Sequence, residues 1–220
     1  MNTAWRDVAW AIQNKRWCPE ATHFAGCFPA GMAAEDAWDA HNDPRTLLFF
    51  ACHLGVPVAS PVRAALSAVQ ETTSQHFACA RVDGARDAVA GFCQGVVGPD
   101  VVSRACDELV DAYYGNENWP HPKDSIAIHY VRAFLGLCQA VLCGAEENTN
   151  AVAAQLCWPM ISATEYATAE RPDDPCAAKK QAARMAVVVR REVPWALVEE
   201  AMQRTVQHTA QHPTGSGETP

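Results

Sequence analysis

Residues 43–54 read DPRTLLFFACHL, and residues 60–71 read SPVRAALSAVQE. In both stretches a helix-capping residue is followed directly by proline and then by apolar residues at helical spacing. Proline holds the residue before it in an extended conformation, where that side chain can cap the first turn, and proline itself loses no hydrogen bond at the first helical position. The same pairing recurs at Gly98-Pro99 and Asp174-Pro175. Four such helix starts predict an all-α protein.

Helical periodicity extends this prediction over most of the chain. We expect at least about 55% helix, well above the ordinary share of about a third, and no sheet of three or more strands. The arrangement predicted is a multi-helix bundle or a short stack of helical hairpins. Pro159 should divide one helix into two short ones, and Pro194 should bend or restart another. The predicted helices cover about residues 3–17, 33–40, 44–54, 60–77, 82–96, 99–114, 128–143, 152–169 and 175–205.

Composition indicates a globular protein. The 220 residues are 49% hydrophobic and 19% charged, which suits one helical domain over residues 1–212 followed by a disordered tail at 213–220. With 17 basic and 25 acidic residues the formal charge is −8, so nucleic acid is not expected as a partner. The start of the chain lacks the pattern of a secretory signal, and the apolar stretch 47–59 is too short to cross a bilayer. We therefore expect a cytoplasmic protein that does not bind membranes.

The ten cysteines do not predict disulfides or a metal site. Their share of the chain lies below that of disulfide scaffolds, many stand among alanines and valines, and no Cys-x-x-Cys occurs. We expect them to be unpaired and mostly buried. Nucleophile-elbow, phosphate-loop, zinc-protease and dinucleotide motifs are also absent. The sequence thus predicts neither a metal nor another cofactor, and it names no catalytic residue.

Carboxylates and an imidazole gather between residues 35 and 43, and such groups can ligate a divalent metal. A solvated acidic helix face explains them better, because the carboxylates recur on a short helix and the last of them already has a capping role. His53, on the most apolar predicted helix, reads as a core histidine with satisfied hydrogen bonds. The residues of the acidic segment are Glu35, Asp36, Trp38, Asp39, His41 and Asp43.

The polar loop after the helix at 99–114 is the best candidate for contact with a partner. It combines aromatic rings, which give large contact area, with asparagines that form adaptable hydrogen bonds. The alternative is that its aromatic residues only cover the ends of neighbouring helices. The candidate partner-binding residues are Tyr113, Tyr114, Asn116, Asn118, Trp119 and His121.

A different class of function stays open, namely a small enzyme with an active site between helices. Such a site would need His41, His53 and His129 to converge with a carboxylate in a deep pocket. His129 and Tyr130 on one helix could also face Glu165 and Tyr166 on another across a shared cleft. Scattered histidines and an exposed aromatic patch would favour a binding protein instead.

Residues 43–54 together with 60–71 resemble the opening helices of small, all-helical, alanine-rich bacterial proteins described as immunity proteins of toxin systems. Similar openings occur in planctomycete proteins that have not been characterised. The likeness covers about 35 residues, most of them core positions, so no functional residue is carried over. It implies an all-α fold and a protein-binding role. A protein-binding module whose partner is another protein is accordingly the expected function.

Overall fold

The computed structural model describes residues 32–73, 79–114 and 125–211. These residues form nine helices and no strand, and the structure is 82% helical. The all-α prediction is confirmed. The helix expected at 3–17 and the tail expected at 213–220 lie outside the described residues. The helices are α3 (Ala34–Ala40), α4 (Pro44–His53), α5 (Ala59–Thr72), α6 (Ala80–Cys93), α7 (Pro99–Tyr114), α8 (Ser125–Ala145), α9 (Thr149–Glu170), α10 (Ala177–Glu192) and α11 (Trp195–Gln211).

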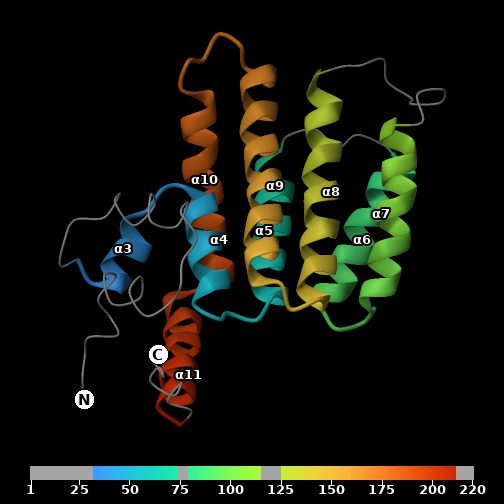
Figure 1. Ribbon diagram of the computed structural model, residues 1–220. Helices are drawn as coiled ribbons and strands as arrows, with labels where there is room; N and C mark the ends of the chain where they lie inside the picture. Colours follow the sequence, from blue (N-terminus) through green and yellow to red (C-terminus); the bar gives the residue numbers. More distant parts are fainter. Residues whose placement is uncertain (1–31, 74–78, 115–124, 212–220) are drawn as a thin grey trace, which may run out of the picture.

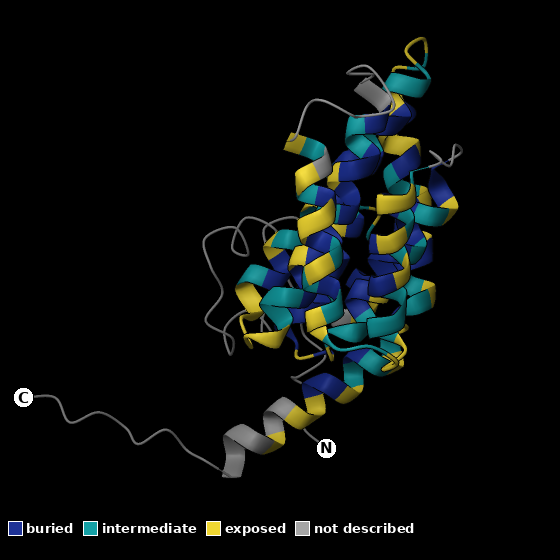
Figure 2. Cartoon of the chain, turned by 90° about the vertical axis from the view of Figure 1, so that its right-hand side faces the viewer, coloured by how far each residue is buried: buried dark blue, intermediate teal, exposed yellow. Residues whose placement is uncertain are grey.

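The long helices form an antiparallel bundle of two layers. In Figure 1, α10, α9, α8 and α7 stand side by side in one layer, and α5 and α6 lie behind them. The centre of the bundle is α9, which packs against α8, α4, α10 and α5. Buried residues fill the inside of the bundle and exposed ones cover its outer faces (Figure 2). The helix α11 follows Pro194 and extends from one end of the bundle.

The first helix of the bundle starts as its sequence predicts. The Asp43 carboxylate accepts a hydrogen bond from the Arg45 backbone N–H at 3.0 Å, and Pro44 takes the first helical position. The Arg45 side chain also donates to this carboxylate, with Nη2 2.8 Å from Oδ2. Nine of the ten residues of α4 are buried. Asp43 therefore fixes the start of a helix that is apolar around most of its circumference.

Replacing Asp43 by alanine should lower the free energy of unfolding by about 1 kcal/mol, because the Arg45 N–H loses its cap. Asp43→Asn is the matched control, since its side-chain oxygen can still accept that bond while the ion pair with Arg45 is lost. An ion pair this exposed contributes little, so the asparagine variant should keep most of the stability. Urea unfolding measures both. Equal losses in the two variants would contradict the capping role.

Two other proline pairs do not mark the first helical residue. The helix α5 begins at Ala59, before Ser60-Pro61, and Pro61 is tolerated there because the first backbone N–H groups of a helix have no intrahelical partner. The helix α10 begins at Ala177, two residues after Pro175. Asp174 instead closes the preceding turn, accepting a bond from the Cys176 N–H at 3.0 Å.

The prediction that Pro159 divides a helix is wrong, because α9 runs unbroken from Thr149 to Glu170. A proline inside a helix leaves the carbonyl four residues earlier without its usual donor and crowds it. Here that carbonyl belongs to Gln155, and Gly136 of α8 lies against it: a Cβ at Gly136 would be 3.2 Å from the Gln155 oxygen and 2.8 Å from the Pro159 Cδ. Close packing against a glycine of α8 thus holds this part of α9 in place.

The longest apolar segment of the described chain is in α8. Residues Ala127–Ala145 are long and apolar enough to cross a membrane by length and composition, and 56% of this window is buried. The helix packs against α9, α7, α6 and α5. Packing among four helices is sufficient to account for this composition.

Candidate functional site

Two of the candidate binding residues, Tyr113 and Tyr114, belong to the last turn of α7. Their rings meet edge to face with centroids 4.8 Å apart, and Tyr114 is 70% exposed. The other four candidates, Asn116, Asn118, Trp119 and His121, lie outside the described residues. The tyrosines therefore stand on a rigid helix, where their position is set by packing.

Arg132 of α8 holds the first of these tyrosines. Its Nε donates a hydrogen bond to the Tyr113 hydroxyl at 3.0 Å, and its guanidinium carbon lies 6.0 Å from the centre of the Tyr113 ring. That distance is the outer limit for a cation–π contact. The arginine is itself exposed, so it offers hydrogen-bond donors next to Tyr114.

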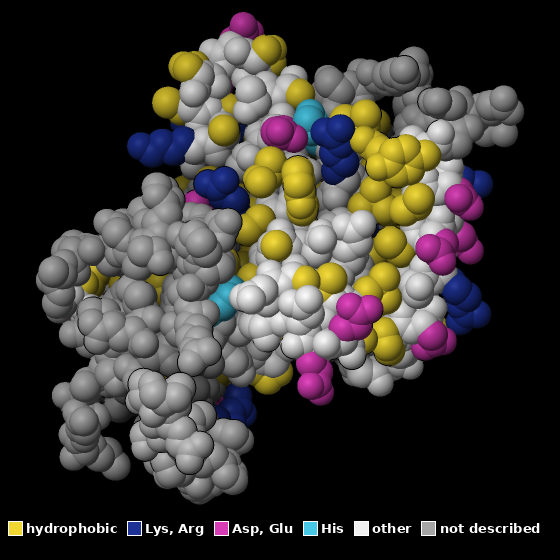
Figure 3. Space-filling view, viewed as in Figure 1, with side chains coloured by type: hydrophobic (Ala, Val, Ile, Leu, Met, Phe, Trp, Pro, Cys, Tyr) yellow, Lys and Arg dark blue, Asp and Glu magenta, His cyan; other side chains and the backbone are white. Residues whose placement is uncertain are grey.

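The helix α9 adds a third aromatic side chain, which lies against α8. Trp158 is 54% exposed, and its Cβ lies 3.1 Å from where a Cβ of Gly136 on α8 would be. Figure 3 shows hydrophobic side chains gathered over the upper part of α8 and its neighbours. We name this region the aromatic surface. It consists of Tyr113, Tyr114, Arg132, Leu135 and Trp158.

Acidic side chains flank the aromatic surface. Asp107, Glu108 and Asp111 are exposed on α7, at helical spacing, and none of them makes an ion pair with another described residue. In Figure 3 acidic side chains follow the edge of the molecule on the α7 side. Since the whole chain carries a formal charge of −8, this flank favours basic groups on anything that approaches.

A close contact between a histidine and a carboxylate joins α8 to α9. The His129 Nδ1 lies 2.8 Å from Oε2 of Glu165, and the glutamate side chain is 47% exposed. Tyr130 and Tyr166, which were expected to face a cleft with this pair, are instead 3% and 1% exposed. Burial raises the pKa of Tyr130. The structure thus brings together two of the four residues and places the other two in the interior.

His53 is a core histidine with satisfied hydrogen bonds, as predicted. Its Nδ1 lies 2.9 Å from the Phe49 carbonyl oxygen, its Nε2 lies 2.8 Å from the Asn150 side-chain oxygen, and its ring stacks on that of Phe49 with centroids 4.0 Å apart. Both ring nitrogens are engaged by groups of the bundle. The imidazole joins the end of α4 to the start of α9.

The three candidate histidines do not meet. His53 contacts Asn150 and His129 contacts Glu165, and these partners are 15 residues apart on α9, or about 22 Å along a helix. His41 lies at a third place, just after α3, where its carbonyl oxygen accepts a hydrogen bond from Arg190. An active site built from all three histidines is therefore not formed.

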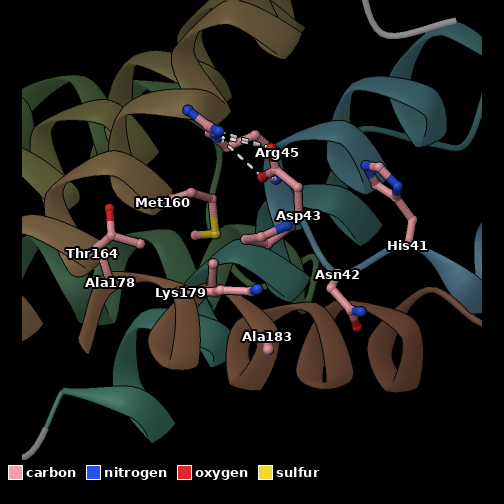
Figure 4. A pocket seen from close by; sticks show the side chains of 11 residues that line it. His41, Asn42, Asp43, Arg45, Met160, Thr164, Ala178, Lys179 and Ala183 are labelled. Carbon is pink, nitrogen blue, oxygen red and sulfur yellow. Dashed lines mark hydrogen bonds and ion pairs between the residues drawn. The ribbon is translucent and has the colours of Figure 1, made fainter. Parts of the chain in front are cut away.

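The carboxylates on α3 are solvated, as the sequence suggests. Glu35, Asp36 and Asp39 are exposed on α3, and nowhere in 32–73, 79–114 or 125–211 do three or more metal-ligating side chains gather. The last two members of the acidic segment, His41 and Asp43, instead line a groove between the start of α4 and the helices α9 and α10 (Figure 4). Its volume is about 500 Å³.

The thiols of the described segments form no disulfide. All eight cysteines of the described segments are free, and of these Cys52, Cys106 and Cys138 are buried, Cys176 is exposed and the rest are half-buried. The expectation of unpaired thiols is confirmed there, whereas burial is less complete than predicted. Burial raises the pKa of Cys52 to about 12. A hydrogen bond between Cys138 and Cys106 raises the pKa of Cys138 and lowers that of Cys106.

Comparisons of the chain with protein families, curated proteins and solved structures find no match. The resemblance to immunity proteins therefore stays a prediction, and the function has to be argued from the geometry of the chain itself.

Proposed function

We propose that this chain is a helical protein-binding module that holds its partner on the aromatic surface. The observation that carries the proposal is the exposure of Tyr114 (70%) and Trp158 (54%), which lie on α7 and α9, two helices that pack against α8. Exposed aromatic rings held on rigid helices are typical anchors of protein interfaces, because they bury large area at little cost in conformational entropy.

The polar groups at this surface support a protein as the ligand. Arg132, already ordered by Tyr113, provides donors that need not be immobilised on binding, and arginine is enriched at interfaces together with tyrosine and tryptophan. The surface is open, so it suits a macromolecule better than a small molecule, which is usually enclosed in a cavity.

The charge beside the surface indicates the character of the partner. Asp107, Glu108 and Asp111 form an acidic flank without ion pairs to the described residues. A partner with lysine or arginine around an apolar centre would complement this flank. Such charges act mainly on the rate of association and on specificity, and salt weakens them.

The enzyme alternative has one observation in its favour, the His129–Glu165 pair, since a carboxylate can orient a histidine for proton transfer. Glu165 is half-exposed, however, and the other candidate histidines are distant from this pair. The geometry therefore favours binding over catalysis.

Replacing Trp158 by alanine should weaken binding of the partner by about 2 kcal/mol or more, about 30-fold in Kd, and should hardly change the unfolding midpoint because the side chain is half-exposed. The partner is first identified in the native host with a photo-crosslinking amino acid at position 158. Affinity is then measured by calorimetry for the wild type and Trp158→Ala.

The matched control is Val187, an apolar residue that is 58% exposed on α10, outside the aromatic surface. Crosslinks from position 187 should not capture the same protein, and Val187→Ala should bind it like the wild type. The proposal would be overturned if position 158 captures no specific protein, or if Trp158→Ala binds as tightly as Val187→Ala.

A further inference from the structure

A groove on the other side of α9 is independent of the aromatic surface. It lies between the start of α4, the middle of α9 and the first turns of α10, and encloses about 500 Å³. Volumes of about 300–1,000 Å³ are typical of sites for small molecules. In Figure 4 the Lys179 side chain extends along the groove toward Asn42 and Asp43, and Met160 lies at its centre.

The charged groups that line the groove leave one positive charge unpaired. Arg45 and Asp43 neutralise each other, with Nη2 and Oδ2 2.8 Å apart. Burial lowers the pKa of His41, and the charge of Arg190 lowers it further, whereas the opposing effect of Asp43 is smaller than that of burial. This imidazole is therefore neutral near pH 7. Lys179 is left as the one lining cation without an ion pair to any described residue.

The neighbouring lysine, Lys180, differs from Lys179 because it has an ion-pair partner and lies outside the groove. Lys180, one residue further along α10, is fixed by Asp174 at 2.9 Å and does not line the groove. The Lys179 amine therefore keeps three donors for a ligand. One free cation matches one negative charge, and a planar carboxylate can accept from an ammonium group in a charge-assisted hydrogen bond.

The remaining walls of the groove are formed mainly by small or aliphatic side chains. Pro44 and Met160 form one side, and Ala178, Ala182 and Ala183 of α10 form the other. Among the described residues that line the groove, the imidazole of His41 is the one aromatic ring, and in Figure 4 this ring points away from the centre of the groove. A flat aromatic ligand would find no ring to stack on, whereas a slender alkyl chain can contact the alanines throughout.

We propose that the groove between α4, α9 and α10 binds a small aliphatic monocarboxylate, with its carboxylate at Lys179 and its alkyl chain along Met160 and the alanines of α10. Asn42, toward which the Lys179 side chain extends, offers a further polar contact to the carboxylate. The site is separate from the aromatic surface and does not depend on its function.

Hexanoate is the probe, and the measurement is a titration followed by ¹H–¹⁵N NMR of the full chain. Saturable shifts should appear at residues 41–45 and 178–183 with a Kd below about 10 mM, a range suited to a ligand of so few atoms. Hexanol, which lacks the charge, should bind about tenfold more weakly. Inorganic phosphate, which lacks the chain, should cause no saturable shifts at these residues.

Lys179→Met should weaken hexanoate binding about tenfold, because it removes the charge and keeps the length of the side chain. Lys180→Met is the matched control and should bind like the wild type. Ala182→Phe should abolish binding by filling the groove, and circular dichroism checks that each variant folds. The proposal is overturned by absent or non-saturable shifts, by equal binding of hexanol, or by equal losses in the two lysine variants.

Discussion

Phe134→Ala is expected to lower the free energy of unfolding by about 3–5 kcal/mol, the range for truncating a large ring in a packed core. Phe134 is fully buried in α8, and its ring meets that of Tyr130 edge to face with centroids 5.0 Å apart. Since the total stability of a domain is about 5–15 kcal/mol, this loss should be visible as a large fall in the urea midpoint.

The neighbouring Leu135→Ala is the control for this prediction. Leu135 is only partly buried, on the outer side of α8, so its truncation should cost about 1 kcal/mol. The comparison also tests why α8 is so apolar. If α8 is a core helix of the bundle, truncating the inward-facing Phe134 should lower the free energy of unfolding much more than truncating Leu135. Equal losses at both positions, or a wild-type chain that needs detergent to stay in solution, would contradict the packing of α8 among α5, α6, α7 and α9.

The helices could be predicted because their signals are local. At Asp43 the cap, the proline and the apolar run agree, and α4 starts at the expected residue. At Ser60 the same signal is displaced, because proline fits at any of the first helical positions and the preceding residues can still join the helix. Local signals therefore give the existence of a helix more securely than its first residue.

Pro159 shows where a local rule fails. The cost of proline in a helix is a property of the segment, but what accommodates it is Gly136, which belongs to another helix and lies 23 residues earlier in the chain. A single sequence shows both residues and gives no sign that they touch. The continuity of α9 is consequently set by tertiary packing.

The same reason limits what the sequence says about the sites. The tyrosines at 113 and 114 are recognisable as candidate contact residues, whereas Arg132, which orients one of them, is a single arginine on an apolar helix. Trp158 and Leu135 join this surface only through the register of α7, α8 and α9. Lys179 and Lys180 look alike in the sequence, and the structure distinguishes them by the ion pair of Lys180 with Asp174 and by the place of Lys179 in the groove.

Gly136→Val should destabilise the fold by about 3 kcal/mol, because the added atoms must enter a closely packed contact. A Cβ at this position would lie 2.8 Å from the Pro159 Cδ, 3.1 Å from the Trp158 Cβ and 3.2 Å from the Gln155 carbonyl oxygen. None of these is the end of a flexible side chain, so α8 and α9 have to move apart. Urea unfolding of the variant measures the loss.

Gly84→Val isolates the packing contribution to that loss. Gly84 is also inside a helix, α6, but a Cβ there would meet nothing within 4 Å. Valine forms helix slightly better than glycine, so the free energy of unfolding of this variant should be unchanged or higher by about 0.3 kcal/mol. Backbone effects are the same at both sites, and the difference between the variants therefore reports the contact of α8 with α9. If Gly136→Val is as stable as Gly84→Val, the close approach at Pro159 is not what holds α9 continuous, and the helix must tolerate its proline by another means.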